Sequence, residues 1–200
     1  MSTAAKHYLT PEEYLAIERA AETKSEYFQG EMFAVAGAGY AHNLLASKLI
    51  QLLAPDADKR GCEVLPSDMR VKISELGKYT YPDVTVTCGK AELEDAHDDT
   101  LLNPVVIFEI LSDSTERYDR GTKFAHYQKL PSLRVYVLVA QDRARVEIYT
   151  RQDGGFWRYE AFEGPEALVA LEPPGARFTL AQLYEGILTV PEADANSAGS

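Results

Sequence analysis

The sequence predicts a single α/β domain in which a mixed β-sheet is flanked by helices. The chain has 200 residues, which suffice for one hydrophobic core but hardly for two. Residues 105–111 (VVIFEIL) form an almost wholly apolar run rich in β-branched side chains, typical of a central strand covered on both faces. Amphipathic helices are predicted on both sides of this run, and no segment repeats. We therefore expect a domain over residues 9–188, an N-terminal arm at 1–8 and a flexible tail at 189–200.

The first half of the chain is predicted to hold two helices and five short strands. Thr10-Pro11-Glu12-Glu13 supplies an N-cap, a proline at the first helical position and a capping-box glutamate, so a helix should run to about residue 22. Leucines at helical spacing predict a second helix over residues 41–57. Gly30 separates the strands of a predicted hairpin. The strands are expected at residues 25–29, 31–36, 62–65, 69–73 and 83–87.

The second half is built around the apolar run. A helix is predicted over residues 118–129, followed by another buried strand at 133–139. Alternating polar and apolar residues at 145–149 and 156–162 indicate outer strands. A short helix over residues 178–187 is expected to close the domain.

Composition indicates a globular protein of the cytoplasm. Hydrophobic residues make up 46% of the chain and charged residues 26%, the usual balance for such proteins. No apolar run approaches the roughly 20 residues of a membrane span, and the N-terminus lacks the layout of a secretory signal. Cys62 and Cys88 have neither the spacing of metal ligands nor the density of a disulfide scaffold. We expect a cytoplasmic protein with no membrane segment.

The charge argues against a general nucleic-acid binder. The chain holds 20 basic and 31 acidic residues, and its formal net charge of −11 disfavours non-specific binding to polyanions. The distribution is uneven, because residues 116–158 carry 9 basic and 5 acidic side chains, a net charge of +4. Any affinity for nucleic acid should therefore be weak and sensitive to salt, so that a metal ion, a preferred substrate or a partner is needed.

Glu109 interrupts the most hydrophobic strand of the chain. With a period of two residues it shares a face with Ile107 and Leu111, whereas Phe108 and Ile110 lie on the other face. Burying a carboxylate is costly unless a cation or hydrogen-bond donors replace its hydration. Two interpretations follow: a core ion pair with an arginine, or a metal-binding or catalytic carboxylate, and we favour the second.

Two aspartates are further candidates. Asp83 follows Pro82 at the start of a predicted strand, 26 residues before Glu109. Alone it would be a turn or cap residue, but two strands and one loop can bring it to the same strand end as Glu109. Asp68 is a weaker candidate, since its alternation with the basic residues at 70 and 72 is also what a half-solvated strand shows.

The predicted helix after Glu109 places Asp119, Lys123 and Tyr127 on one stripe, because they are spaced four residues apart. Asp119 and Lys123 could form an ordinary surface pair. Alternatively, Lys123 is a cation beside the acidic residues, with Tyr127 behind it, and the sequence favours neither. His42, near the start of a helix, is a candidate for lining the site, although an ordinary cap or a partly buried role is favoured for it.

Taken in order, these motifs resemble the Uma-two family, a branch of the PD-(D/E)XK nuclease superfamily. The resemblance rests on Pro82-Asp83, on Glu109 within its hydrophobic strand, and on DRGTK at residues 119–123 followed by Tyr127. It extends to SEYFQGE at residues 25–31, followed by His42, and to the strand at 133–139. The similarity therefore spans about residues 9–187.

The resemblance implies a restriction-endonuclease-like fold and a metal-dependent endonuclease that hydrolyses phosphodiester bonds of DNA. Asp83, Glu109 and the backbone carbonyl of Ile110 would bind the metal, expected to be Mg²⁺ with Mn²⁺ as an alternative, because Mg²⁺ prefers oxygen ligands. The superfamily carries its catalytic lysine two residues after the second acid, where this chain and its family have an apolar residue, here Leu111. Lys123 is the natural replacement. Accessory candidates are Glu26, His42, Asp68 and Tyr127.

Other functions stay open at this point. The net charge and Leu111 are also compatible with a binding or assembly module that keeps the nuclease fold but is catalytically weak or inactive. A small-molecule hydrolase that reuses the site is a third class. An apolar surface on the outer strands would suit a homodimer, the commonest assembly of proteins in this class.

Overall fold

The computed structural model describes residues 8–188. The predicted tail at 189–200 and all of the predicted arm except Tyr8 lie outside this range. Within residues 8–188, no helix has the length and apolar character needed to cross a membrane.

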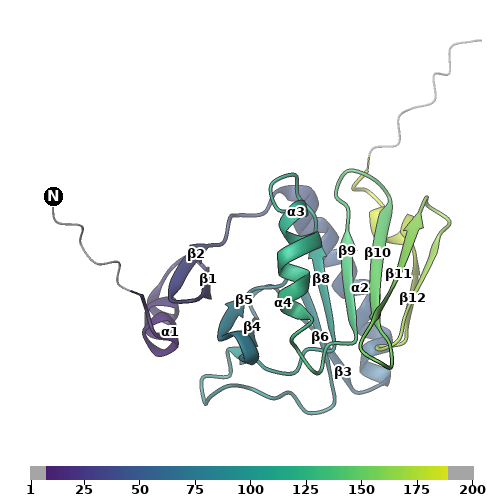
Figure 1. The fold of residues 1–200 in the computed structure, drawn as a ribbon. Coiled ribbons are helices and arrows are strands. Elements are labelled where there is room, and N and C mark those ends of the chain that lie inside the picture. Colours follow the sequence, from purple (N-terminus) through teal and green to yellow (C-terminus); the bar gives the residue numbers. More distant parts are fainter. Residues whose placement is uncertain (1–7, 189–200) are drawn as a thin grey trace, which may run out of the picture.

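A six-stranded mixed sheet forms the centre of the molecule (Figure 1). The apolar run forms β8, which pairs in parallel with β9 and antiparallel with β6; β3, β10 and β11 continue the sheet in antiparallel fashion. The mixed sheet is therefore confirmed. Its strands, in spatial order, are β11 (Trp157–Glu163), β10 (Arg145–Arg151), β9 (Val135–Val139), β8 (Val106–Ile110), β6 (Val84–Cys88) and β3 (Cys62–Pro66).

A second sheet, which the sequence did not predict as separate, lies on the N-terminal side. Its order is β2 (Glu31–Ala34), β1 (Ser25–Phe28), β5 (Lys78–Thr80), β4 (Arg70–Ile73) and β7 (Thr100–Leu101). The hairpin β1–β2 is as predicted, but β5 and β7 are too short to leave a periodic signal in the sequence. A third, two-stranded sheet, β12 (Leu168–Leu171) with β13 (Ala176–Thr179), was also not predicted.

Helices cover both faces of the central sheet. Figure 1 shows α2 (Tyr40–Lys59) behind it, and α3 (Glu116–Tyr118) and α4 (Phe124–Tyr127) in front. Between α3 and α4 lies a π-helical turn, η2 (Asp119–Lys123), where the sequence predicted a plain α-helix. A short 3₁₀-helix, η1 (Ser74–Leu76), connects β4 to β5.

The ends of α1 and α5 follow their capping residues. α1 (Pro11–Ala20) begins at the predicted capping box, in which Thr10 and Glu13 bond reciprocally. α5 (Leu180–Tyr184) is shorter than predicted, because Thr179 is its N-cap and also ends β13.

The alternation of β8 divides the core into two layers, as predicted. Val106, Phe108 and Ile110 pack in a cluster with the buried leucines of α2. Ile107 and Leu111 belong to the opposite cluster, which includes residues of α4. Glu109 lies on this second face, beneath the helix that carries Lys123.

Cys62 and Cys88 face each other across β3 and β6 and form a disulfide. They are neither metal ligands nor part of a disulfide-rich scaffold, since a single cross-strand bridge accounts for both cysteines of the chain.

Candidate active site

Asp83 and Glu109 meet at one edge of the central sheet. Because β6 and β8 are antiparallel, with Val84 opposite Phe108, the start of β6 lies beside the end of β8. Oδ2 of Asp83 accepts a hydrogen bond of 2.7 Å from the backbone N–H of Ile110. The side chain of Asp83 is thus held against the strand that carries Glu109.

His42 reaches the same place from the first turn of α2. Its Nε2 lies 2.8 Å from Oδ1 of Asp83, so both oxygens of Asp83 have a partner. The sequence left His42 as an unfavoured candidate. Only the packing of α2 behind the sheet places it at the site.

Glu109 is buried, with 3% of its surface exposed, and both its oxygens are engaged. Oε2 lies 2.7 Å from Nζ of Lys123, and Oε1 accepts a 2.8 Å hydrogen bond from the Tyr127 hydroxyl. The predicted alternative was a core ion pair between Glu109 and an arginine. Glu109 does form a buried ion pair, but with Lys123. Burial raises the pKa of Glu109 to about 8: Lys123 opposes the shift, and the nearby Asp83 adds to it.

Lys123 is the common cation of three carboxylates. Besides Glu109, its Nζ lies 3.6 Å from Oδ1 of Asp119 and 4.0 Å from Oε1 of Glu26. Burial lowers the pKa of Lys123, but the carboxylates of Glu109, Glu26 and Asp119 outweigh it and raise the pKa well above its usual range. Lys123 therefore stays charged inside the protein.

The π-helical turn delivers Lys123 to this position. Asp119 and Lys123 are its first and last residues and the only two of its five that are buried. Wide turns of this type are frequent at functional sites. Asp119 is the site residue that the sequence analysis did not include among its site candidates; its four-residue spacing from Lys123 was the only signal. Its pKa is raised by burial, against the effect of Lys123.

The second sheet completes the site through Glu26 and Thr80. The hydroxyl of Thr80 donates a hydrogen bond to Oε1 of Glu26 and lies 3.3 Å from the hydroxyl of Tyr127. Tyr127 in turn donates to Glu109. The contacts close a ring of five side chains, since Lys123 approaches both Glu109 and Glu26. We call Glu26, Thr80, Tyr127, Glu109 and Lys123 the polar ring.

Asp68 is not part of this site. It lies in the turn before β4, where its side chain is 87% exposed and pairs with Lys24 at 2.8 Å. The alternation that suggested Asp68 fails because β4 begins only at Arg70. The structure therefore places Asp68 in solvent, in a turn rather than in the half-solvated strand that the alternation suggested.

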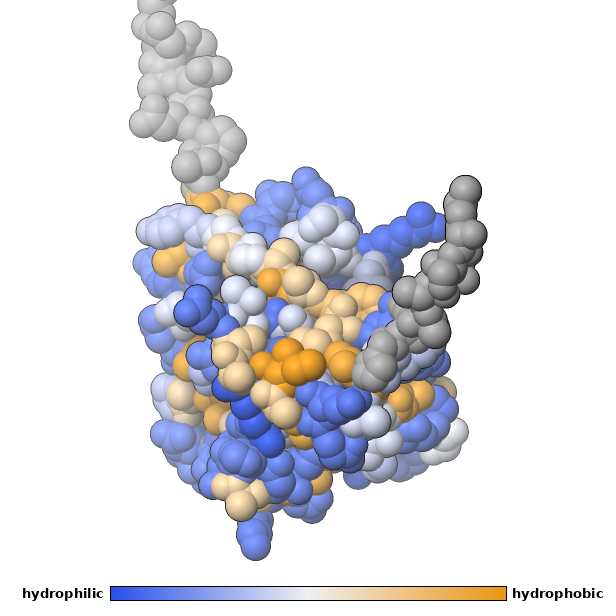
Figure 2. All heavy atoms as spheres, turned by 90° about the vertical axis from the view of Figure 1, so that its left-hand side faces the viewer, coloured by the Kyte–Doolittle hydropathy of each residue, from blue (hydrophilic) through white to orange (hydrophobic). Residues whose placement is uncertain are grey.

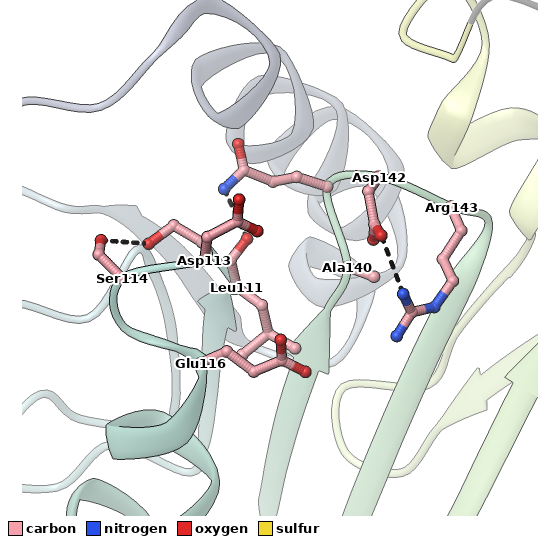
Figure 3. Close-up of a pocket in the computed structure, with 9 residues that line it drawn as sticks. Leu111, Asp113, Ser114, Glu116, Ala140, Asp142 and Arg143 are labelled. Carbon is pink, nitrogen blue, oxygen red and sulfur yellow. Dashed lines mark hydrogen bonds and ion pairs between the residues drawn. The ribbon is translucent and has the colours of Figure 1, made fainter.

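A hollow of about 490 Å³ is drawn with its lining residues in Figure 3, and Asp83, Glu109 and Lys123 are not among them. It opens at the carboxyl ends of the parallel strands β8 and β9, between the segments 111–116 and 140–143. Its lining includes Leu111, which follows Glu109 of the polar ring by two residues in the sequence. Such crevices at the ends of parallel strands are the usual ligand sites of α/β proteins.

The carboxylate oxygens at the site are of the type that binds a hard divalent cation, but each already contacts another group of the protein. Within residues 8–188, no three His, Cys, Asp or Glu side chains form a group that could hold a metal ion. Asp83 and Glu109 offer carboxylate oxygens, the ligands that Mg²⁺ prefers. Each of these oxygens contacts His42, Ile110, Lys123 or Tyr127. A cation would share these oxygens with their partners or displace one of them.

The fold and the carboxylate–lysine cluster at a strand end define an α/β protein of the restriction-endonuclease-like class. The sequence model of the Uma2 family, described as "Putative restriction endonuclease", matches residues 11–182. The chain therefore belongs to the Uma2 family, the Uma-two family that its motifs resemble. The predicted fold class is confirmed.

Two curated proteins of Synechocystis sp. (strain ATCC 27184 / PCC 6803 / Kazusa) are similar over most of their length. The protein slr1290 is 34% identical over 179 residues, 90% of this chain and 93% of its own. The protein sll1609 is 37% identical over 167 residues, 84% of this chain and 94% of its own. The crystal structure of "a putative nuclease belonging to DUF820" from Anabaena variabilis ATCC 29413 has the same fold: its TM-score is 0.73 at 20% identity, over 90% of this chain and 99% of that one.

Proposed function

We propose that this protein is a metal-dependent endonuclease that hydrolyses DNA phosphodiester bonds at the site of Asp83, Glu109 and Lys123. The observation that carries the proposal is the 2.7 Å contact between Lys123 and Glu109 beside Asp83, at the strand ends. The family's description and the nuclease named for the Anabaena structure support the same reaction. Lys123 then takes the place of the lysine that the superfamily carries where this chain has Leu111.

Charge balance supports a divalent cation at this site. Four carboxylates gather here, those of Glu26, Asp83, Glu109 and Asp119. The lysines among them are Lys123 and Lys78, and His42 contacts Asp83. Two negative charges are left over when the four carboxylates and two lysines are ionised, a state that the raised pKa values of Glu109 and Asp119 oppose without a further cation. Asp83, Glu109 and the carbonyl of Ile110 would hold Mg²⁺, or alternatively Mn²⁺. Such an ion polarises the phosphodiester and lowers the pKa of a bound water molecule.

The side chains of the chain itself would position the reacting groups. Tyr127 fixes Oε1 of Glu109, and His42 fixes Oδ1 of Asp83, so the two carboxylates keep their orientation. The ammonium group of Lys123 would offset the negative charge that develops on the phosphate in the transition state. Because Lys123 is held by three carboxylates, it needs no rearrangement of the fold to stay charged.

The test is nicking of supercoiled plasmid DNA with Mg²⁺ or Mn²⁺ by the wild type, Glu109→Gln, Lys123→Met and the control Asp68→Asn. The wild type and Asp68→Asn should nick DNA at equal rates only when metal is present. The two site variants should be at least about a hundredfold slower, the usual cost of a lost catalytic group. Equal rates in all four proteins, or metal-independent nicking, would contradict the proposal.

A second function is favoured by the engaged oxygens of Glu109. If Lys123 and Tyr127 hold them permanently, the fold serves as a binding or assembly module that is catalytically weak or inactive. Isothermal calorimetry with Mg²⁺ and Mn²⁺ separates the two functions. The nuclease should bind metal in a way that Asp83→Asn abolishes, and the module should release no heat in either protein. A small-molecule hydrolase would bind metal but leave DNA intact.

We also propose DNA as the partner, a homodimer as the assembly and the cytoplasm as the compartment. With a net charge of −11, binding to DNA should be weak and should fade as salt is raised. Exposed apolar side chains suit a homodimer: Phe156 and Leu168 near the outer strands, and Phe33 and Val35 on the opposite side. Figure 2 shows hydrophobic surface amid hydrophilic side chains on the side that carries the hairpin.

Sedimentation velocity distinguishes a dimer from a monomer, and Phe156→Ser tests the outer strands. The predicted cytoplasmic location bears on Cys62 and Cys88, because disulfides are rare in that compartment. Thiol labelling of protein from freshly lysed cells would show whether the pair is reduced there.

A further inference from the structure

The five-stranded sheet presents a second buried lysine to the site. Lys78 in β5 is 2% exposed, although a buried ammonium group is costly unless it is paired. The alternation of β5 turns Lys78 and Thr80 to one face, while Tyr79 packs on the other face with Tyr14 and Tyr27. The face with Lys78 is the one that meets the polar ring through Thr80.

Glu26 is the carboxylate that pairs with Lys78. Tyr27 lies opposite Tyr79 in the pairing of β1 with β5, so Glu26 comes opposite Thr80 and its side chain lies on the face of Lys78. Oε2 of Glu26 is 3.7 Å from Nζ of Lys78. The remaining contacts of Lys78 are neutral or aromatic: Tyr118, with its hydroxyl at 2.7 Å, His126 at 3.4 Å, and the ring of Phe28.

The two oxygens of Glu26 thus have different partners. Oε2 faces Lys78, whereas Oε1 accepts from the hydroxyl of Thr80 and lies 4.0 Å from Lys123. With both oxygens held, the carboxylate cannot rotate away from the polar ring without losing an ion pair. The positive charge of Lys78 also weakens the attraction between Glu26 and Lys123. Lys123 therefore keeps its 2.7 Å contact with Glu109.

We propose that Lys78 is a positioning residue of the active site. It pairs with Glu26 and thereby holds the Glu26 carboxylate in the polar ring, next to Lys123. The inference rests on the proposed nuclease function. Lys78 does not touch DNA in this role, since it is almost wholly buried. It therefore affects the rate of the chemical step rather than the affinity for the substrate.

The kinetic test compares plasmid nicking by Lys78→Met, Glu26→Gln and the double variant, with Tyr118→Phe as matched control. Lys78→Met should lower kcat about tenfold or more, as displaced catalytic groups do, with KM for DNA within about twofold. The double variant should be no slower than Glu26→Gln alone, because Lys78 acts through Glu26. Lys78→Arg should restore part of kcat. Tyr118→Phe removes the other close bond of Lys78 and should keep the wild-type rate.

Three kinetic results would overturn the proposal. A raised KM with unchanged kcat would make Lys78 a DNA contact. Multiplicative losses in the double variant would make Lys78 and Glu26 independent. A kcat for Lys78→Met equal to that of the wild type would leave Lys78 with a purely structural role.

Urea unfolding gives a readout that needs no activity. The double variant should lose less stability than the sum of the losses in Lys78→Met and Glu26→Gln, because both single variants remove the same ion pair. Additive shifts of the midpoint would overturn the pairing whether or not the protein cleaves DNA. Coupled midpoints in a protein that never nicks DNA would refute the proposed function and leave the pairing of Lys78 with Glu26 intact.

Discussion

Nζ of Lys123 lies 2.7 Å from Oε2 of Glu109, a contact between a helical turn and the strand beneath it in the most apolar part of the protein. Both side chains are buried, so neither charge can be satisfied by water. The pair therefore belongs either to catalysis or to a structural core, and the two roles respond differently to mutation.

Breaking the pair from one side should destabilise the protein. Glu109→Gln or Lys123→Met should each lower the free energy of unfolding by about 3 kcal/mol, since each leaves a buried charge with a weaker partner. The double variant should lose less than the sum of the two. Urea denaturation of the four proteins measures this coupling, and strictly additive losses would show that the two groups do not interact.

Removing His42 should slow the reaction without unfolding the protein. His42→Ala frees Oδ1 of Asp83, and the loss of such a supporting hydrogen bond reduces activity or metal affinity by about tenfold to a hundredfold. His97→Ala, at an exposed loop position, is the control. The measurement is the initial rate of nicking with Mg²⁺. If His42→Ala nicks DNA at the wild-type rate while His97→Ala is slow, His42 does not support the site.

Metal should stabilise the wild type against heat. Saturating Mg²⁺ binds the folded state alone, and at a hundred times Kd it contributes about 2.7 kcal/mol, a rise of several degrees in Tm. Asp83→Asn should abolish the rise, and Asp68→Asn, outside the site, should keep it. Calorimetric melting with and without Mg²⁺ is the measurement. A Tm of wild type that is indifferent to metal would favour the inactive module.

Acid should weaken the junction of Asp99 with Arg19 and Arg70. Hydrogen bonds from Arg19, followed by the charge of Arg70, hold the pKa of Asp99 far below its usual range, against the effect of burial. Because the folded-state pKa is depressed, the stabilisation is present above the unfolded pKa of about 3.9 and is lost as pH falls toward the folded pKa. At neutral pH, Asp99→Asn should cost about 1 kcal/mol, allowing for a carboxylate one-third exposed.

The cost of Asp99→Asn should shrink as pH falls below about 4. Urea midpoints between neutral pH and pH 2 test this. Asp98→Asn is the neighbouring control, because asparagine tolerates the left-handed φ of 55° at that position. If the difference in urea midpoint between Asp99→Asn and the wild type stays constant with pH, ionisation of Asp99 does not stabilise the fold.

Much of the site could be predicted from local sequence. Glu109 stood out because a carboxylate in an apolar strand breaks a pattern that burial otherwise imposes. The four-residue spacing of Asp119, Lys123 and Tyr127 predicted one helical stripe, and that stripe does face the acidic strand end. The π-helical form of the turn could not be predicted, because its hydrogen bonds leave no spacing signal of their own.

The partners of Glu26 could not be predicted in the same way. Thr80 is 54 residues from Glu26 in the sequence. It lies in a strand of three residues, which is too short to show an alternation of polar and apolar side chains. Nothing in the local sequence singled out Lys78, whereas Asp68 was a weak site candidate. Their true positions depend on which strands share a sheet, and that choice is made by packing between distant segments.

The sequence by itself determined the buried faces of the longer helices and strands, and through them the fold class, because burial repeats with the local geometry of the backbone. It also marked Asp83, Glu109 and Lys123 as candidate site residues. The tertiary structure alone decided that a second sheet supplies Glu26, Thr80 and Lys78, that His42 reaches Asp83, and that Asp68 stays in solvent. The physical reason is that periodicity fixes the face on which a side chain lies, whereas its partner across the site depends on how separate elements pack.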